Sequence, residues 1–255
     1  MTAVKIAFLH YDCISKNTVE NLKQLTEGIC IAAENGADWI LTPELALQGY
    51  HFSLFGRINE IYDNLEEVIS PILQAAKKYR VYIFLGCAVK DNKKGTLHNS
   101  CLVIDTEGII KGRCDKRFIH GRAETRFCAG KTSELFECGR IKTGILLCSD
   151  IFYKENIILM KELKPEVIIV PAAWAAGYGI TPGKIWSDFS SSLKNIPILI
   201  CNQTGSDFKI NCNLAESTVL NNGEILMSYK GKPAILFTEI NFSENKIAQR
   251  QFIKV

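Results

Sequence analysis

The sequence predicts an α/β fold in a single domain, residues 1–255, with helices packed outside mixed β-sheets. Short apolar runs typical of strands alternate with amphipathic helical patterns in both halves of the chain. Hydrophobic residues make up 47% of the 255 residues and charged residues 22%, so the chain can bury a large core. No linker rich in Pro, Gly or Ser and no charge block divides the chain, which favours one domain over two.

The first half of the chain alternates between strand and helix patterns. Asn17-Thr18 caps the first predicted helix, Asn35-Gly36 ends it, and Pro71 must kink the second helix or begin a new turn. The predicted strands are residues 4–9, 39–41 and 81–86, and the predicted helices are residues 17–34 and 58–79. This order of elements is typical of α/β proteins.

The second half repeats the same pattern after a hairpin. Strands at residues 100–104 and 109–111 are joined by a turn at 105–108, and a further hairpin turns at residues 221–223. The other predicted strands are residues 144–148, 167–170, 198–201 and 234–237, and the other predicted helices are residues 155–163 and 185–193. Together the two halves predict mixed sheets with helices on their outer sides.

Charge and hydropathy exclude several partners and locations. The chain has 30 basic and 27 acidic side chains, and the net charge of +3 is too small to favour binding to nucleic acid or anionic membranes. No run reaches the roughly 18 apolar residues that a transmembrane helix needs. His10 and Asp12 interrupt the amino terminus before a signal-peptide core can form. We therefore expect a cytoplasmic protein with no membrane and no nucleic-acid partner.

The ten cysteines are expected to be reduced thiols, because a cytoplasmic compartment disfavours disulfides. No two cysteines are spaced as C-x-x-C, and none of the four histidines forms an H-x-x-x-H pair. A structural zinc site is therefore poorly supported, and we expect no metal. Each cysteine is first interpreted as a small buried hydrophobic residue.

The first segment with candidate catalytic chemistry contains Glu44. This residue follows the predicted strand at 39–41, directly after Pro43, and apolar residues flank it on both sides. A position on the solvent-exposed surface is therefore a poor explanation for the Glu44 carboxylate. Two interpretations are open, namely a functional carboxylate or an acid at the start of a helix that the helix dipole stabilises.

The second segment, residues 113–130, is rich in charge near the end of the predicted hairpin. Basic residues at a strand exit usually face solvent, and we interpret Arg113 and Arg117 in this way. Lys116 lies close to the apolar pair Phe118-Ile119, which favours a partly desolvated ammonium.

The third segment contains Cys148, where an apolar strand gives way to Ser149 and Asp150. Pockets in α/β sheets open at the carboxyl ends of strands, and the N–H groups of the following turn would face a developing oxyanion there. This context is typical of a nucleophile. Cys114 is the closest competitor, because its basic neighbours would lower its pKa.

The order Glu44, Lys116, Cys148 resembles the nitrilase superfamily of carbon–nitrogen hydrolases, whose members carry a Glu-Lys-Cys triad in this order. The resemblance covers nearly the whole chain and includes residues around each member of the triad. The matching neighbours are Pro43, Gly49 and Tyr50, then Glu124, Phe127 and Gly130, then Gly144, Asp150, Tyr153 and Glu155. Further matches are Asn99, Ser100, the 105–108 turn, Pro171, Trp186 and Asn202. Three motifs in one order form a stronger signal than any one of them.

The resemblance implies a four-layer αββα sandwich that forms a homodimer or a higher homo-oligomer. It implies that Cys148 is the nucleophile, that Glu44 is the general base, and that Lys116 stabilises the oxyanion. Glu124 would be the second glutamate that many members carry, and would orient Lys116 or the substrate. No metal or organic cofactor is required.

The resemblance also implies a small-molecule substrate and residues that contact it. Tyr50, Ser149 and Trp174 are the candidate substrate-binding residues, although Trp174 is equally well interpreted as a core aromatic residue. The favoured activity is hydrolysis of an amide or carbamoyl amide, with release of ammonia or an amine. The alternatives are nitrile hydrolysis, acyl transfer, a catalytically silent binding protein on the same fold, and a cysteine redox sensor.

The chain departs from the pattern of the family at four positions. Phe152 and Lys154 stand where an arginine and a proline are common, Ser191 stands where many members have arginine, and Thr42 replaces a more usual apolar residue. These departures leave the triad intact and concern the shape of the pocket and the packing of the helices.

Overall fold

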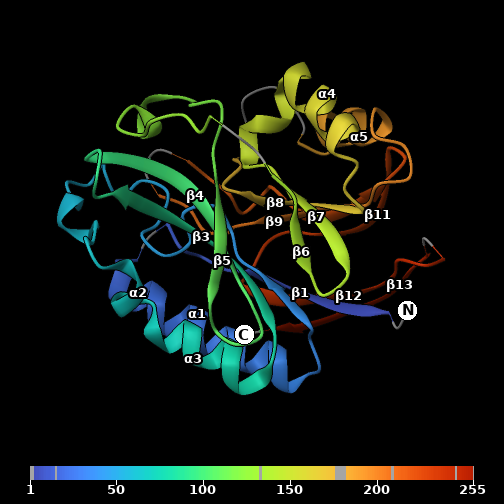
Figure 1. Ribbon diagram of the computed structural model, residues 1–255, viewed down its shortest axis with the longest axis horizontal. Helices are drawn as coiled ribbons and strands as arrows, with labels where there is room; N and C mark the ends of the chain where they lie inside the picture. Colours follow the sequence, from blue (N-terminus) through green and yellow to red (C-terminus); the bar gives the residue numbers. More distant parts are fainter. Residues whose placement is uncertain are drawn as a thin grey trace.

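Two β-sheets pack face to face, and helices cover the outer face of each sheet, so the molecule has four layers (Figure 1). The computed structural model describes residues 3–14, 16–131, 134–175, 182–207, 210–244 and 246–254. This α/β arrangement confirms the predicted αββα sandwich.

The larger sheet has seven strands, and the smaller has six. In spatial order the larger sheet contains β13 (Lys246–Lys254), β12 (Ala234–Asn241), β1 (Val4–His10), β2 (Trp39–Leu41), β3 (Tyr82–Asp91), β4 (Thr96–Ile104) and β5 (Ile110–Asp115). The smaller contains β11 (Glu224–Tyr229), β10 (Ser217–Asn221), β9 (Ile198–Asn202), β8 (Val167–Ala172), β7 (Ile141–Ile145) and β6 (Phe136–Cys138). Each sheet has three adjacent parallel strands, β1-β2-β3 and β7-β8-β9, flanked by antiparallel strands.

The helices begin where local capping chemistry allows. Asn17 caps α1 (Thr18–Glu34) through a capping box with Glu20. The helical pattern predicted at 58–79 is divided into separate elements, and Pro71 lies in the first turn of α3 (Ser70–Tyr79), which confirms the predicted new turn at this proline. A missing N–H costs nothing in the first turn of a helix. The remaining elements are η1 (Ile58–Glu60), α2 (Leu65–Val68), α3 (Ser70–Tyr79), η2 (Arg122–Glu124), η3 (Cys148–Phe152), α4 (Lys154–Leu163) and α5 (Pro182–Ser191).

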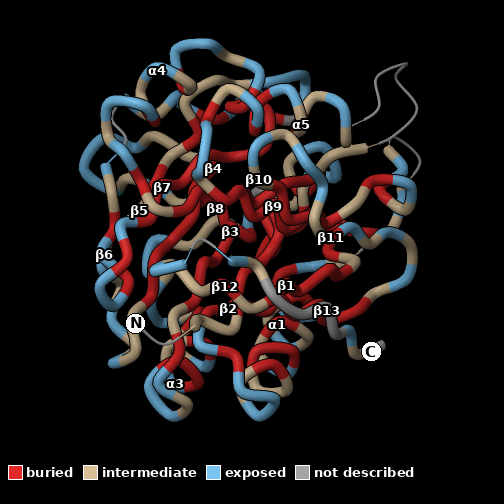
Figure 2. The backbone as a smooth tube through the Cα atoms, turned by 90° about the vertical axis from the view of Figure 1, so that its right-hand side faces the viewer, coloured by how far each residue is buried: buried red, intermediate tan, exposed pale blue. Residues whose placement is uncertain are grey.

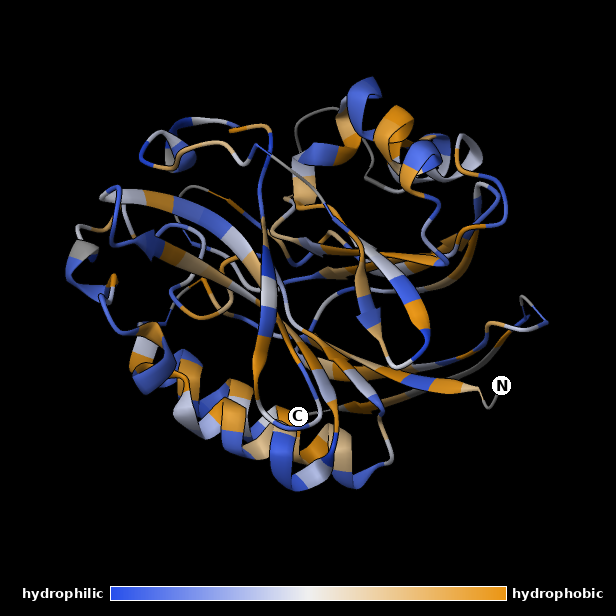
Figure 3. Ribbon diagram, in the orientation of Figure 1, coloured by the Kyte–Doolittle hydropathy of each residue, from blue (hydrophilic) through white to orange (hydrophobic). Residues whose placement is uncertain are grey.

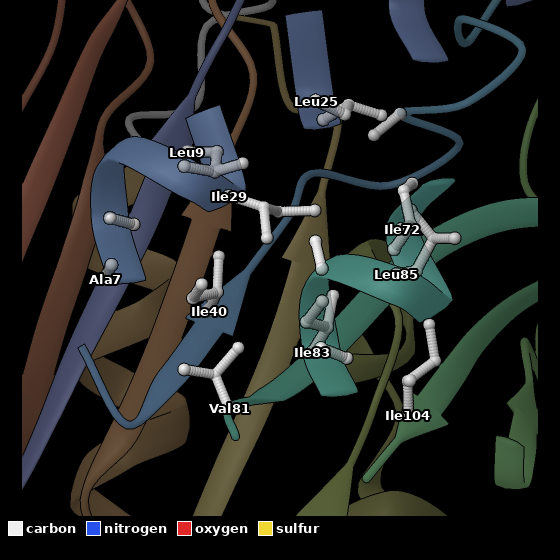
Figure 4. Close-up of a cluster of buried hydrophobic side chains, with 14 of the residues drawn as sticks. Ala7, Leu9, Leu25, Ile29, Ile40, Ile72, Val81, Ile83, Leu85 and Ile104 are labelled. Carbon is white, nitrogen blue, oxygen red and sulfur yellow. The ribbon is translucent and has the colours of Figure 1, made fainter. Parts of the chain in front are cut away.

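Three apolar layers hold the sandwich together. Ile29 of α1 and Ile72 of α3 pack toward Ile40 and Ile83 of the larger sheet (Figure 4). A second layer fills the space between the sheets, and a third lies between the smaller sheet and α4 and α5. Figure 2 shows the buried residues concentrated along the central strands, and Figure 3 shows hydrophobic and hydrophilic residues alternating along α1, α2 and α3. Burial of these faces is the main source of stability.

Some predicted boundaries are wrong near the candidate site. The strand predicted at 144–148 ends at Ile145, and Cys148 begins the short 3₁₀ segment η3 instead. The helix predicted at 185–193 is α5, which begins and ends earlier in the chain. The strands β6 and β13 were not predicted. Among the described residues, no helix combines the length and apolar character needed to cross a bilayer.

Candidate active site

Three segments far apart in the sequence supply the predicted triad. Glu44 lies in the turn after β2, Lys116 follows β5, and Cys148 begins η3 after β7. The strands β2 and β5 belong to the larger sheet, and β7 belongs to the smaller one. The Glu44 N–H donates to the Ala172 carbonyl at the end of β8, with an N–O distance of 3.3 Å. The site therefore lies where the two sheets meet.

A close approach of two backbone segments holds the turn that carries Glu44. A Cβ atom at Gly86 in β3 would lie 2.0 Å from the Pro43 carbonyl oxygen, so a side chain does not fit there. The Thr42 hydroxyl accepts from the Gly86 N–H (2.8 Å) and donates to the Phe84 carbonyl (3.1 Å). The departure from the family pattern at Thr42 thus has a structural role, because its hydroxyl fastens the turn to β3.

Glu44 and Lys116 form a buried ion pair. Lys116 Nζ lies 2.7 Å from Glu44 Oε1, and both side chains are at most 1% exposed. Asn99 Nδ2 donates to the same carboxylate oxygen at 2.8 Å. The other oxygen, Glu44 Oε2, is buried and has no hydrogen-bond partner within the described part of the chain, so it is available to accept a proton. No helix begins at Glu44, and the helix-dipole interpretation is therefore wrong.

A second buried carboxylate, Glu124, also contacts Lys116. Its Oε1 lies 2.5 Å from Lys116 Nζ and accepts from the Tyr50 hydroxyl at 2.8 Å, while its Oε2 accepts from the His120 N–H at 2.8 Å. Burial, followed by the charge of Glu44, raises the pKa of Glu124. Burial is the largest single influence on the pKa of Lys116 and acts to lower it, but the acidic groups around the ammonium, Glu44 foremost and Glu124 with its hydrogen bond, together make the net shift upward. Lys116 therefore remains an ammonium between two carboxyl groups.

Cys148 is buried in a strained backbone conformation. It is 7% exposed, and its φ of +45° lies in the left-handed region that residues other than glycine rarely adopt. Burial, followed by the negative charge of Glu44, raises the pKa of the Cys148 thiol, while Lys116 and a hydrogen bond from the Ala173 N–H act in the opposite direction. The thiol therefore keeps its proton at neutral pH, and its attack on a substrate requires a base.

Asp150 joins the lysine segment to the cysteine segment. Its carboxylate accepts from the N–H groups of Leu147 (3.1 Å), Arg117 (3.2 Å) and Phe118 (2.9 Å). Burial raises the pKa of Asp150 to about 6, although these hydrogen bonds act to lower it. This bridging role was not predicted, although the short distance in sequence from Cys148 was a usable signal. Arg117 is not a simple solvent-facing cation, because Nη1 donates to Asn156 in α4.

A cavity of about 730 Å³ opens beside Cys148 and Lys116. The three predicted substrate-binding residues, Tyr50, Ser149 and Trp174, all line it. Ser149 Oγ is buried without a hydrogen-bond partner among the described residues. Trp174 is half-buried and packs against the core beneath α5 while it lines the cavity, so the interpretation as a core residue alone is wrong.

The cavity also contains residues that sequence reasoning missed. His51 lines it, and His51 Nδ1 lies 2.5 Å from Asp207 Oδ2, with both side chains nearly buried. Phe152, His120 and Arg122 line it as well. His51 and Asp207 are 156 positions apart, and nothing in the sequence pairs them. From the sequence alone, Phe152 is only a departure from the family pattern.

The other cysteines and departures lie away from the triad. Cys114 is buried between the two sheets, with Sγ 3.4 Å from the Ile145 carbonyl oxygen, and it does not line the cavity. None of the ten cysteines forms a disulfide. Lys154 begins α4 and Ser191 ends α5, both exposed and outside the cavity lining. In the described ranges, no three His, Cys, Asp or Glu side chains group to hold a metal ion.

Comparisons with known proteins place the chain in a family. The carbon–nitrogen hydrolase family model matches residues 6–241. A nitrilase of Pyrococcus abyssi is 28% identical over 171 residues, which is 66% of this chain and 64% of the relative. A citrullinase of Francisella tularensis is 28% identical over 182 residues, which is 68% of this chain and 62% of the relative. The matched part thus spans less than two thirds of either relative.

A solved structure supports the fold independently. An amidase from Nesterenkonia sp. superposes with a TM-score of 0.81 at 18% identity, covering 95% of this chain and 93% of that one. At this identity the likeness concerns the fold. The family match over residues 6–241 shows that the chain belongs to the carbon–nitrogen hydrolase family of the nitrilase superfamily.

Proposed function

We propose that this chain hydrolyses the C–N bond of an amide or carbamoyl amide of a small molecule through a thioester on Cys148. The observation that carries the proposal is the buried ammonium of Lys116 bridging Glu44 and Glu124 beside a thiol that lines a cavity. Buried charges are costly to a fold unless they are paired. Such an arrangement is explained by chemistry better than by stability.

The first half of the reaction forms the thioester. Glu44 takes the proton of the Cys148 thiol as Sγ attacks the carbonyl carbon, and the carbonyl π electrons move to oxygen. Lys116 and the N–H of Ser149 stabilise the resulting oxyanion. When the tetrahedral intermediate collapses, the C–N bond breaks, and Glu44 delivers its proton to the departing nitrogen. Ammonia or an amine leaves, and the acyl group stays on sulfur.

The second half of the reaction releases the acid. Glu44 takes a proton from a water molecule, which attacks the thioester carbon, and the same oxyanion contacts stabilise the second tetrahedral intermediate. Collapse breaks the C–S bond and returns the proton to sulfur. Glu124 holds Lys116 in place throughout, with Tyr50 fixing its carboxylate.

Relatives named nitrilase and citrullinase leave more than one class of substrate open for this cavity. We favour amides and carbamoyl amides over nitriles by analogy within the superfamily. A nitrile would meet the same thiol and give a thioimidate, so product analysis separates the two. The intact set of base, cation and thiol argues against a catalytically silent binding protein.

The proposal is tested by ammonia release from a panel of small amides, carbamoyl amides and nitriles. Cys148→Ala should abolish turnover, whereas Cys128→Ala, which removes an exposed thiol, should leave turnover unchanged. Glu44→Gln should slow alkylation of Cys148 by iodoacetamide at least about tenfold, since the thiol then lacks its base. Turnover that survives in Cys148→Ala would refute the mechanism.

Oligomeric state and location remain predictions. The resemblance to the superfamily predicts a homodimer or a higher homo-oligomer, and light scattering at several concentrations measures the mass directly. A cytoplasmic location is expected from the sequence alone.

A further inference from the structure

Large apolar side chains line the cavity, and we call this set of residues the apolar wall. Phe152 is 41% exposed and Leu54 is 39% exposed, and both line the cavity together with Trp174 and Ile210. Exposed aromatic and aliphatic side chains that face a concave pocket mark a place where apolar ligand surface is buried. Nothing in the triad chemistry requires them, because proton transfer and oxyanion stabilisation use other groups.

The aromatic part of this wall is held in place. The ring centroids of Phe152 and Trp174 lie 4.8 Å apart with an interplanar angle of 47°. Trp174 contacts the buried Trp186 edge to face, at 5.8 Å and 81°. The backbone N–H of Trp174 also donates to Asn202 Oδ1 at 2.7 Å. The wall is therefore preorganised, so a ring that docks there loses little free energy to the ordering of protein side chains.

The position of this wall relative to the nucleophile is set by short chain segments. Cys148 begins η3 and Phe152 ends it, and at the roughly 2 Å rise per residue of a 3₁₀-helix their Cα atoms are about 8 Å apart. Trp174 directly follows Ala173, whose N–H contacts the Cys148 thiol. Phe152 and Trp174 therefore belong to the same two chain segments that hold Cys148, and all three residues line one cavity.

The basic side chains that line the cavity are poorly placed to bind an anionic substrate group, so the apolar wall is the better candidate for substrate recognition. His51 is already paired with the carboxylate of Asp207. Lys116 lies between Glu44 and Glu124. The side chains of His120 and Arg122 belong to exposed residues at the rim, where water weakens the recognition of a carboxylate.

We propose that Phe152 and Trp174 form an aryl subsite, and that preferred substrates carry an aromatic ring on the acyl side of the amide. This rests on the proposed amide hydrolysis. Phe152 and Trp174 are then specificity-determining residues, whereas Glu44, Lys116 and Cys148 carry out the chemistry.

The test compares kcat/KM for 2-phenylacetamide, 2-cyclohexylacetamide and succinamate. The first two differ in the aromaticity of rings of similar size, and the third carries a carboxylate instead. We expect a preference for phenyl over cyclohexyl of roughly fivefold, because aromatic pairs gain energy beyond burial, and weaker turnover of succinamate. Phe152→Ala and Phe152→Leu should reduce the phenyl preference to less than about twofold.

A matched control is Phe252→Ala, which removes a ring that is 56% exposed on β13 and does not line the cavity. It should leave the ratio of the two kcat/KM values unchanged. A higher kcat/KM for succinamate than for phenylacetamide, or a phenyl preference that survives both Phe152 variants, would overturn the subsite.

A binding measurement separates this inference from the proposed function. Calorimetric titration of Cys148→Ala with phenylacetamide and with cyclohexylacetamide, with and without Phe152→Ala, reads the subsite without turnover. If binding favours phenylacetamide and depends on Phe152 while the unmodified chain hydrolyses no amide, the proposed subsite stands and the proposed amide hydrolysis is refuted. If the unmodified chain hydrolyses amides but the Phe152 variants keep the preference for phenylacetamide, the proposed hydrolysis stands and the subsite is refuted.

Discussion

Two buried regions of the molecule bury different kinds of group. The core beneath α1 and α3 contains aliphatic side chains such as Ile29, Ile72 and Ile83, and each contributes stability without needing a particular partner (Figure 4). The cluster of Glu44, Lys116, Glu124 and Cys148 buries ionisable groups, whose desolvation costs several kcal/mol per ion and is offset only by their contacts with one another. The first region builds the fold, and the second is a cost that the fold carries for chemistry.

Removal of the ammonium should have the largest effect. In Lys116→Met, two carboxyl groups stay buried without their cation, so we expect the free energy of unfolding to fall by about 4 kcal/mol. We also expect kcat/KM to fall about 10³-fold, because the oxyanion loses a charged contact. Urea unfolding and steady-state kinetics measure the two effects. Lys161→Met, at an exposed position on α4, is the control, and equal stability of the two variants would contradict the buried-charge argument.

A cavity in the aliphatic core should change stability alone. Ile29→Ala removes buried methyl groups and should lower the free energy of unfolding by about 3 kcal/mol. The kcat/KM per folded molecule should stay at the value of the unmodified chain, since Ile29 packs in the layer between α1 and the larger sheet, whereas Cys148 belongs to the cluster on the smaller sheet. Val19→Ala on the exposed face of α1 provides the matched comparison in the same denaturant titration. A tenfold loss of kcat/KM in Ile29→Ala would show that the two regions are coupled.

The smallest expected effect is the pH dependence that Asp150 contributes. Its folded-state pKa of about 6 lies above the usual 3.8, so the folded state binds more protons than the unfolded state between these values. Stability from this group is present at low pH and is lost as the pH rises through 6. Between pH 4.5 and 6.5 the loss is about 2 kcal/mol.

The comparison chain for this pH dependence is Asp150→Asn, which cannot titrate. Its absolute stability should be lower, because an amide presents one acceptor oxygen to three N–H donors. Unfolding at several pH values should therefore show a shallower decline in Asp150→Asn than in the unmodified chain. Parallel curves would contradict the raised pKa.

The apolar strands and α1 were predictable because each is a local pattern. A run such as residues 167–170 is apolar throughout, which predicts a buried strand. Asn17 and Glu20 have the spacing of a capping box, which predicts the start of a helix. The strand β13 was not predictable, because Lys246–Lys254 mixes charged and apolar residues and pairs only with β12 at the sheet edge. Tertiary pairing, rather than propensity, decides such a segment.

The candidate site likewise has features that the sequence predicts and features that it does not. The order of glutamate, lysine and cysteine was visible in the sequence, and the structure brings Glu44 and Lys116 to 2.7 Å. The left-handed backbone of Cys148 was not visible, because no glycine marks it. The bridge through Asp150 and the pair of His51 with Asp207 also went unseen, since each depends on segments that meet only after the sheets pack.

The hydrogen bond from Glu44 to Ala172 crosses between the sheets, and it has a consequence for how the chain can be divided. Residues 3–131 supply both carboxyl groups and the ammonium, whereas the thiol belongs to residues 134–175. Two fragments cut between these ranges would each lack part of the triad. Catalysis would return only when the fragments reassemble, which requires β12 of the second fragment to pair with β1 of the first as well as the two sheets to pack. Turnover would therefore report the reassembly of the whole sandwich.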